Sequence, residues 1–274
     1  MNSTISNLNI LLPILYVALW IDYAFLFFRN QILTKRITKY LLCATVLIHG
    51  FYLLLHTFTY QQFPFATVFE AFSFIAFSVT TLYLFIEYRI GVRTTGFFIL
   101  GIVFFFQTVS SLFIEAPLQT SELLWEPVFI LHVSCALLGY SGMAISAVYG
   151  LLYLMLFYDI KKQRFGLIYK QLPSLEVMAT FNYRSATLGQ FFLTVAMIGG
   201  ITLLVQVYGT YWTWDSKLMV TFIAWLIYTV CIGGKLFFNW SERKIAITSI
   251  TGFGLILFSL IFVNLVFTRF HGFM

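Results

Sequence analysis

Histidine is the residue type in this sequence with the widest chemistry, and the chain contains four of them. They are His49, His56, His132 and His271. A neutral imidazole can ligate a metal ion, and it can also take up or release a proton near neutral pH. His49 and His56 are seven positions apart. On one helix they would therefore project from nearly the same face, about 10.5 Å apart along the axis. Each histidine could instead make an ordinary hydrogen bond between helices.

The segment 208–217, YGTYWTWDSK, is the second feature with chemical potential. Its candidate residues are Tyr211, Trp212, Trp214, Asp215 and Lys217. Flat aromatic surfaces with a few polar groups suit a flat, largely apolar ligand. A porphyrin is one such ligand, since two imidazoles can ligate its iron and Lys217 or Arg269 can meet its carboxylates. A quinone or a sterol would satisfy the composition equally, and aromatic residues also serve as anchors at membrane interfaces.

Two acidic residues stand in largely apolar surroundings and are further candidates for polar sites. Asp22 is expected to make a hydrogen bond between helices, whereas Glu70 is a candidate site member near a helix end. The three cysteines are scattered singly, without the CxxC, CxxCH or zinc spacing of a redox, haem-attachment or metal motif. The sequence also lacks a recognisable nucleophile–base pair, phosphate loop or pair of catalytic carboxylates, so catalysis is not indicated.

The elements that position these residues are predicted to be membrane helices. The chain has 274 residues, of which 61% are hydrophobic and only 9% are charged. A soluble domain has about 25% charged residues. Apolar stretches of roughly 20 residues, long enough to cross the bilayer, recur along the whole sequence, which predicts one all-α integral membrane domain with about eight transmembrane helices. The expected domain is 1–274, and the expected spans are 8–28, 38–58, 66–87, 95–114, 128–157, 187–208, 218–238 and 246–268.

The distribution of lysine and arginine predicts the orientation of these spans. Fourteen of the 16 basic residues fall in the connections after the first, third, fifth and seventh spans, and the exceptions are Lys217 and Arg269. Basic residues gather on the cytoplasmic side, so both termini are predicted to lie outside, with every histidine in the outer half. The longest inner connection, 158–186, is expected to form a short helix along the membrane surface at 173–181, or a docking surface for a cytoplasmic partner. The net charge of +6 is thus explained by topology, and no nucleic-acid-binding module is present.

At the tryptophan-rich segment the sequence resembles a known family. YGTYWTWDSK is similar to the "WWD" signature of the haem-handling cytochrome c assembly family, which includes CcsA, CcmC and CcmF. The resemblance extends from about residue 63 to the end and rests on further motifs in matching order. They are FPFATVFE at 63–70, LHVS at 131–134, NYR at 182–184, WLIY at 225–228, and VN at 263–264 followed by FHGF at 270–273.

The resemblance implies a haem b on the outer side, held against the tryptophan segment between two histidines. The two ligands carry over to His132 and His271. The expected cofactor-binding set also contains Trp212, Trp214, Asp215, Tyr211, Lys217, Glu70 and His49.

The sequence also departs from the haem-exporting members of that family. Ser216 and Leu218 replace the proline and glutamate that usually follow the signature, and Gly233 stands near the place of an expected histidine. These differences disfavour a second haem inside the membrane, and they make the chain most similar to the HemX branch, which is linked to haem biosynthesis and control of glutamyl-tRNA reductase. The expected partners are haem, membrane lipids, and either a cytochrome c biogenesis subunit or glutamyl-tRNA reductase, in a bacterial cytoplasmic membrane. A regulatory protein that acts through its cytoplasmic loop, without functional haem, is the alternative.

Overall fold

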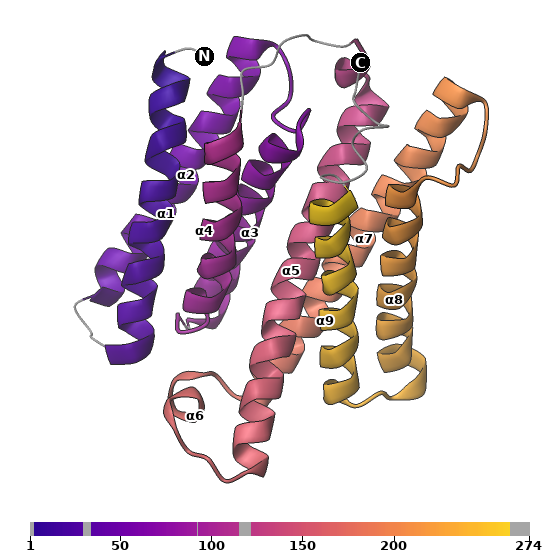
Figure 1. Cartoon of the computed structure of the whole chain (residues 1–274). Coiled ribbons are helices and arrows are strands. Elements are labelled where there is room, and N and C mark those ends of the chain that lie inside the picture. Colours follow the sequence, from indigo (N-terminus) through magenta and orange to yellow (C-terminus); the bar gives the residue numbers. More distant parts are fainter. Residues whose placement is uncertain (1–2, 30–33, 92, 115–121, 264–274) are drawn as a thin grey trace. The chain divides into compact units, whose positions relative to one another are not determined.

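The computed structural model describes residues 3–29, 34–91, 93–114 and 122–263, and this part of the chain is helical without any strand (Figure 1). Eight of its helices are long and apolar enough to cross a membrane. These are α1 (Ser3–Arg29), α2 (Thr34–Tyr60), α3 (Val68–Ile90), α4 (Gly96–Phe113), α5 (Pro127–Lys161), α7 (Leu175–Tyr208), α8 (Ser216–Phe238) and α9 (Glu242–Phe258). A 3-10 turn (Glu122–Trp125), the short α6 (Leu167–Gln171) and a π-helical turn (Ser259–Val263) complete the elements. The prediction of an all-α membrane protein with eight spans is confirmed.

The start of α7 corrects one expectation. The segment 173–181 was predicted to lie along the membrane surface, but from Leu175 it forms the first turns of a single helix of 34 residues. Ser174 caps that helix, because its side chain accepts a hydrogen bond from the backbone N–H of Val177. Asn182, the residue after that segment, is buried and accepts a hydrogen bond of 2.8 Å from Ser146 on α5. The helix is thus already packed against α5 directly after the predicted segment.

The chain divides into two compact units. Unit 1 comprises residues 1–126 and 159–173, and it contains α1–α4 together with the connection that carries α6. Unit 2 comprises 127–158 and 174–274, and it contains nearly all of α5 with α7, α8 and α9.

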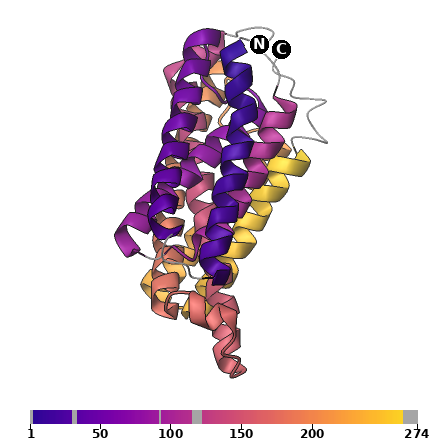
Figure 2. The same ribbon diagram turned by 90° about the vertical axis from the view of Figure 1, so that its left-hand side faces the viewer.

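Unit 1 is a bundle in which α1 packs on α2 and α4, and α3 packs on α2 and α4 (Figures 1 and 2). Because successive helices run in opposite directions, α1 and α3 begin at the end of the bundle where α2 and α4 finish. We call this the Glu70 end, because Glu70 lies in the first turn of α3. The opposite end carries Arg29, Arg89 and Arg93, and we call it the Arg93 end.

Unit 2 is held together by close contacts between backbones of α5 and α7. A Cβ added to Gly189 on α7 would lie 2.8 Å from the carbonyl oxygen of Gly139 and 2.9 Å from the backbone nitrogen of Met143. A Cβ added to Gly142 would lie 3.0 Å from the Cα of Gly189. Small residues of this kind let membrane helices approach until their backbones touch, which compensates for the weak hydrophobic drive in lipid. They fix α5 and α7 relative to each other, and His132 lies between these two helices.

Candidate functional site

The imidazole of His132 is oriented by a hydrogen bond between helices. His132 lies near the start of α5, and its Nδ1 is 2.6 Å from the backbone carbonyl oxygen of Ala196 on α7. A carbonyl can only accept, so Nδ1 carries the hydrogen and Nε2 keeps its lone pair. Within the described part of the chain Nε2 makes no hydrogen bond. Histidines that bind a metal are held in this way, with one ring nitrogen donating to a carbonyl and the other left for the metal.

Two glycines on α7 form the surface against which this ring packs. A Cβ at Gly200 would lie 2.8 Å from Cε1 and 3.1 Å from Nδ1 of His132. A Cβ at Gly199 would lie 3.3 Å from the Cβ of His132. Any side chain at Gly200 would push the ring away from Ala196. The Gly199–Gly200 pair therefore keeps the imidazole in one position, and it was missed in the sequence because nothing local connects it with His132.

The tryptophan-rich segment connects α7 and α8 at the same end of unit 2 as His132. Gly209 ends α7 in the left-handed conformation (φ 65°), which glycine adopts without strain. The ring centroids of Trp212 and Trp214 are 6.0 Å apart and the rings are nearly perpendicular, and Trp212 also contacts Phe222 on α8 at 5.6 Å. Trp214 is 82% exposed and Tyr211 is 74% exposed. The loop thus presents large apolar surfaces that no described residue covers.

Asp215 and Lys217 have distinct positions at the start of α8. Asp215 is the N-cap, since its Oδ1 accepts hydrogen bonds from the backbone nitrogens of Lys217 (2.9 Å) and Leu218 (3.2 Å). This role positions the tryptophan-rich segment whether or not the carboxylate also meets a ligand. The Lys217 ammonium is near enough to His132 to act on it electrostatically. The structure therefore brings into one unit His132, Tyr211, Trp212, Trp214, Asp215 and Lys217.

The remaining predicted ligand and its basic neighbour, His271 and Arg269, lie outside the described residues. No cluster of three or more histidine, cysteine, aspartate or glutamate side chains suited to a metal ion occurs in the described ranges.

His49 belongs to unit 1, and both of its ring nitrogens are hydrogen-bonded. Nδ1 is 2.8 Å from the hydroxyl of Tyr16 on α1, and Nε2 is 3.0 Å from the hydroxyl of Ser73 on α3. Ser73 donates in turn to Oε1 of Gln107 on α4 at 3.1 Å. This direction makes Nε2 of His49 the donor and Nδ1 the acceptor from Tyr16. Neither nitrogen is free, so a role for His49 as a ligand would require one of these bonds to break.

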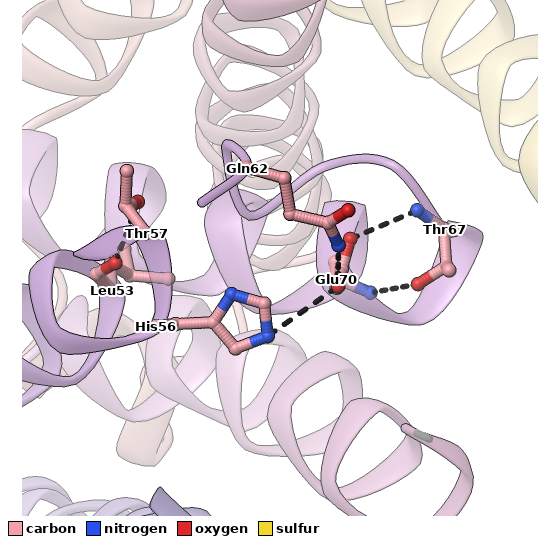
Figure 3. Close-up of polar contacts among 6 residues, drawn as sticks. All are labelled: Leu53, His56, Thr57, Gln62, Thr67 and Glu70. Atoms are coloured by element: carbon pink, nitrogen blue, oxygen red, sulfur yellow. Dashed lines mark hydrogen bonds and ion pairs between the residues drawn. The ribbon is translucent and has the colours of Figure 1, made fainter. Parts of the chain in front are cut away.

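His56 and Glu70 form a second buried group at the Glu70 end of unit 1 (Figure 3). His56 Nε2 lies 3.5 Å from Oε1 of Glu70, and the side-chain nitrogen of Gln62 lies 3.4 Å from the same oxygen. Glu70 Oε2 accepts a 3.0 Å hydrogen bond from the backbone nitrogen of Thr67, which completes a capping box at the start of α3. The pairing of Glu70 with His56 was not predicted, because it depends on how the α2–α3 connection folds.

The other carboxylate considered from the sequence, Asp22, accepts a hydrogen bond from the hydroxyl of Thr38 on α2. The expected hydrogen bond between helices is confirmed.

Comparison with known proteins identifies the family of this chain. The profile of the family "Cytochrome C assembly protein" matches residues 7–271, a longer region than the stretch from residue 63 on which the motifs rest. Cytochrome c biogenesis protein CcsA of Heterosigma akashiwo is 24% identical over 279 residues, which cover 89% of this chain and 87% of that protein. CcsA of Mesostigma viride is 22% identical over 272 residues, covering 90% and 89%. CcsA of Prochlorococcus marinus is 33% identical over 103 residues, covering 38% and 33%. The chain is a multi-pass membrane protein of the cytochrome c assembly family.

Proposed function

We propose that this protein binds haem b at the end of unit 2 formed by the start of α5 and the α7–α8 loop, and that it presents this haem for cytochrome c assembly. The observation that carries the proposal is the state of His132. Its Nδ1 bonds Ala196 and its Nε2 makes no hydrogen bond to a described residue, which is the arrangement of a ligating histidine. The names of its relatives, cytochrome c biogenesis proteins, support the same reaction pathway.

Each residue at this end of unit 2 would make a different contact with the haem. His132 and His271 would hold the iron through their imidazole nitrogens, and the iron would supply redox chemistry. The exposed faces of Trp214 and Tyr211 would cover the apolar macrocycle, since they present uncovered aromatic surface. Lys217 would pair with a propionate. By the distribution of basic residues this end faces the outer side, with both termini there.

A complementation experiment tests this proposal in cells. Deleting the gene is expected to abolish covalent c-type cytochromes, and the wild-type gene is expected to restore them. A His132→Ala variant should fail to restore them although it reaches the membrane in normal amount. A Gly254→Ala variant should restore them fully, since a Cβ at Gly254 meets no atom within 4 Å. Normal cytochromes in the deletion strain would exclude this function.

A HemX-like role in a bacterial cytoplasmic membrane is the second candidate. It is favoured by Ser216 and Leu218 after the tryptophan-rich segment, and by Gly233, whose added Cβ would meet only Phe237 at 3.8 Å. The protein would then act on haem synthesis through its basic connections, with glutamyl-tRNA reductase as a partner. It would do so with bound haem, or without functional haem as a purely regulatory protein. In that case deletion should change the amount of that reductase and leave covalent cytochromes intact.

A further inference from the structure

Unmatched polar atoms are concentrated at one end of unit 1. Six buried side-chain atoms have no hydrogen-bond partner among the described residues, and five of them belong to α1–α4 and the α2–α3 connection. The five are Asn9 Oδ1, His56 Nδ1, Gln62 Oε1, Thr108 Oγ1 and Ser110 Oγ. Every one lies at the Glu70 end, because Asn9 follows the start of α1, His56 precedes the end of α2, and Thr108 and Ser110 precede the end of α4.

These side chains are enclosed by protein. His56 is 2% exposed and Gln62 is 1% exposed, and Ser110 is completely buried. Buried polar groups in native proteins almost always have a partner, which is a protein group or an ordered water. Leaving five of them dry would cost about as much as the whole stability of an ordinary domain. All five can accept a hydrogen bond: two are amide oxygens, two are hydroxyl oxygens, and Nδ1 of His56 is an acceptor when Nε2 carries the hydrogen, so a donor such as water fits them.

The only carboxylate among these groups is held firmly at one oxygen, Oε2, which is part of the capping box, and loosely at the other. Glu70 is 1% exposed, and its Oε1 has contacts of 3.4 and 3.5 Å, both at or beyond the long limit of a good hydrogen bond. Figure 3 shows that the imidazole of His56 points its Nε2 at Glu70, while its unpartnered Nδ1 lies on the other side of the ring. An ionisable pair inside a membrane bundle is costly, and where it occurs it commonly moves protons or ions.

We propose that the Glu70 end of unit 1 is a hydrated proton-binding site, in which water connects Glu70 and His56 with the aqueous phase. A proton from water adds to the Glu70 carboxylate or to His56, and it leaves by the same route. No electron transfer or covalent step is involved. The site is separate from the haem-binding residues proposed for unit 2, and it does not depend on them.

The apolar interior of the bundle limits proton exchange to the Glu70 end. From His49 toward the Arg93 end, the connected hydrogen bonds continue only to Tyr16 and Thr80, whose hydroxyls are 3.3 Å apart. The next layer toward the Arg93 end contains Leu19, Leu100 and Val103, all of which are fully buried. Thr45, one turn from His49 on α2, is also fully buried, but its hydroxyl donates to the carbonyl oxygen of Leu41 and offers a proton no acidic or basic group. The site should therefore exchange protons with the Glu70 side and should not conduct them across the membrane.

Few other ionisable groups face the pair. On α2 they are Tyr52, Tyr60 and His49, and the rings of His56 and Tyr60 are 4.7 Å apart. On α1 the nearest is Tyr16, which bonds His49, and α4 contributes only uncharged polar groups such as Gln107 and Ser110. Glu70 and His56 are therefore the titratable pair of this site, since their side chains face each other directly.

Infrared spectroscopy of the full-length protein in lipid bilayers tests the proposal. On acidification a protonated carboxyl band is expected, and it should shift within minutes when H₂O is replaced by D₂O. Glu70→Gln should remove this band. His56→Gln should keep it and change the pH at which it appears. Glu242→Gln should leave it unchanged, because Glu242 lies in unit 2 and pairs with Lys235.

Two results would overturn the proposal. One is a carboxyl band that is the same in Glu70→Gln as in the wild type, or one that does not exchange with D₂O. The other is a steady proton leak through the wild-type protein in liposomes that enclose a pH dye, which would mean that the path is not one-sided. If Glu70→Gln does not fold, Glu70→Asp provides the same test, since its carboxyl band should move in frequency. An unmoved band in that variant would count against the assignment.

Discussion

Replacing Gly200 with alanine is expected to weaken haem binding by about 10- to 100-fold, although residue 200 would not touch the haem iron. The added methyl group would lie 2.8 Å from Cε1 and 3.1 Å from Nδ1 of His132, closer than carbon and nitrogen atoms pack. The ring must move, and the 2.6 Å hydrogen bond from Nδ1 to Ala196 is lost or lengthened. Loss of such an orienting partner typically costs 10- to 100-fold in affinity, about 1.4 to 2.8 kcal/mol.

The assay is a titration of haem into the haem-depleted protein, followed by the absorbance of the bound form. Gly254→Ala is the matched control, because it is also a glycine-to-alanine change in a membrane helix and its Cβ would meet nothing within 4 Å. Alanine is a better helix former than glycine, so a weaker affinity in Gly200→Ala could not be ascribed to helix propensity. Unchanged affinity and an unchanged spectrum in Gly200→Ala would refute the reasoning that His132 is a ligand oriented by α7.

Three further predictions concern unit 2. Gly189→Ala should lower the thermal unfolding temperature, because overpacking of the α5–α7 contact costs about 1–3 kcal/mol. Gly233→Ala is the control and should leave that temperature unchanged. If the two variants unfold at the same temperature, the close contact of α5 and α7 does not limit stability. Asp215→Asn should preserve stability, since asparagine also caps helices, while Asp215→Ala should lose about 1 kcal/mol in the same measurement. If Asp215→Asn nevertheless binds haem poorly, the carboxylate acts beyond capping. Trp214→Ala should reduce haem affinity without changing the unfolding temperature of the haem-free protein, because this side chain is 82% exposed. An unchanged haem affinity would show that Trp214 does not contact the haem.

The architecture was predictable because the membrane imposes it. Apolar stretches that must satisfy their backbone groups internally have to be helices, so the eight spans follow from hydropathy alone. The error lay at the start of α7, where the mixed pattern of 173–181 suggested a separate interfacial helix. The segment instead continues into one helix of 34 residues, whose Asn182 has a buried partner on α5 that cannot be recognised from the local sequence.

The residue types of the candidate site were predictable from the sequence, but the hydrogen-bonding state of each histidine was not. Spacing alone could not tell which of the four histidines are ligands, and only the family resemblance singled out His132 and His271. The structure distinguishes three of them through their nitrogens: His132 has Nε2 free, His49 has both nitrogens bonded, and His56 has one facing Glu70. These differences arise from residues more than 10 positions away in the chain, such as Ala196 and Tyr16. Long-range packing of this kind leaves no local pattern.

The central claim is that His132 and His271 hold a haem at unit 2, and the absorption spectrum of the purified protein tests it most directly. Protein from haem-replete cells is expected to show a Soret band, which should change when either histidine is replaced by alanine and disappear when both are replaced. A protein without a Soret band, or a band unaffected by the double replacement, would contradict the account.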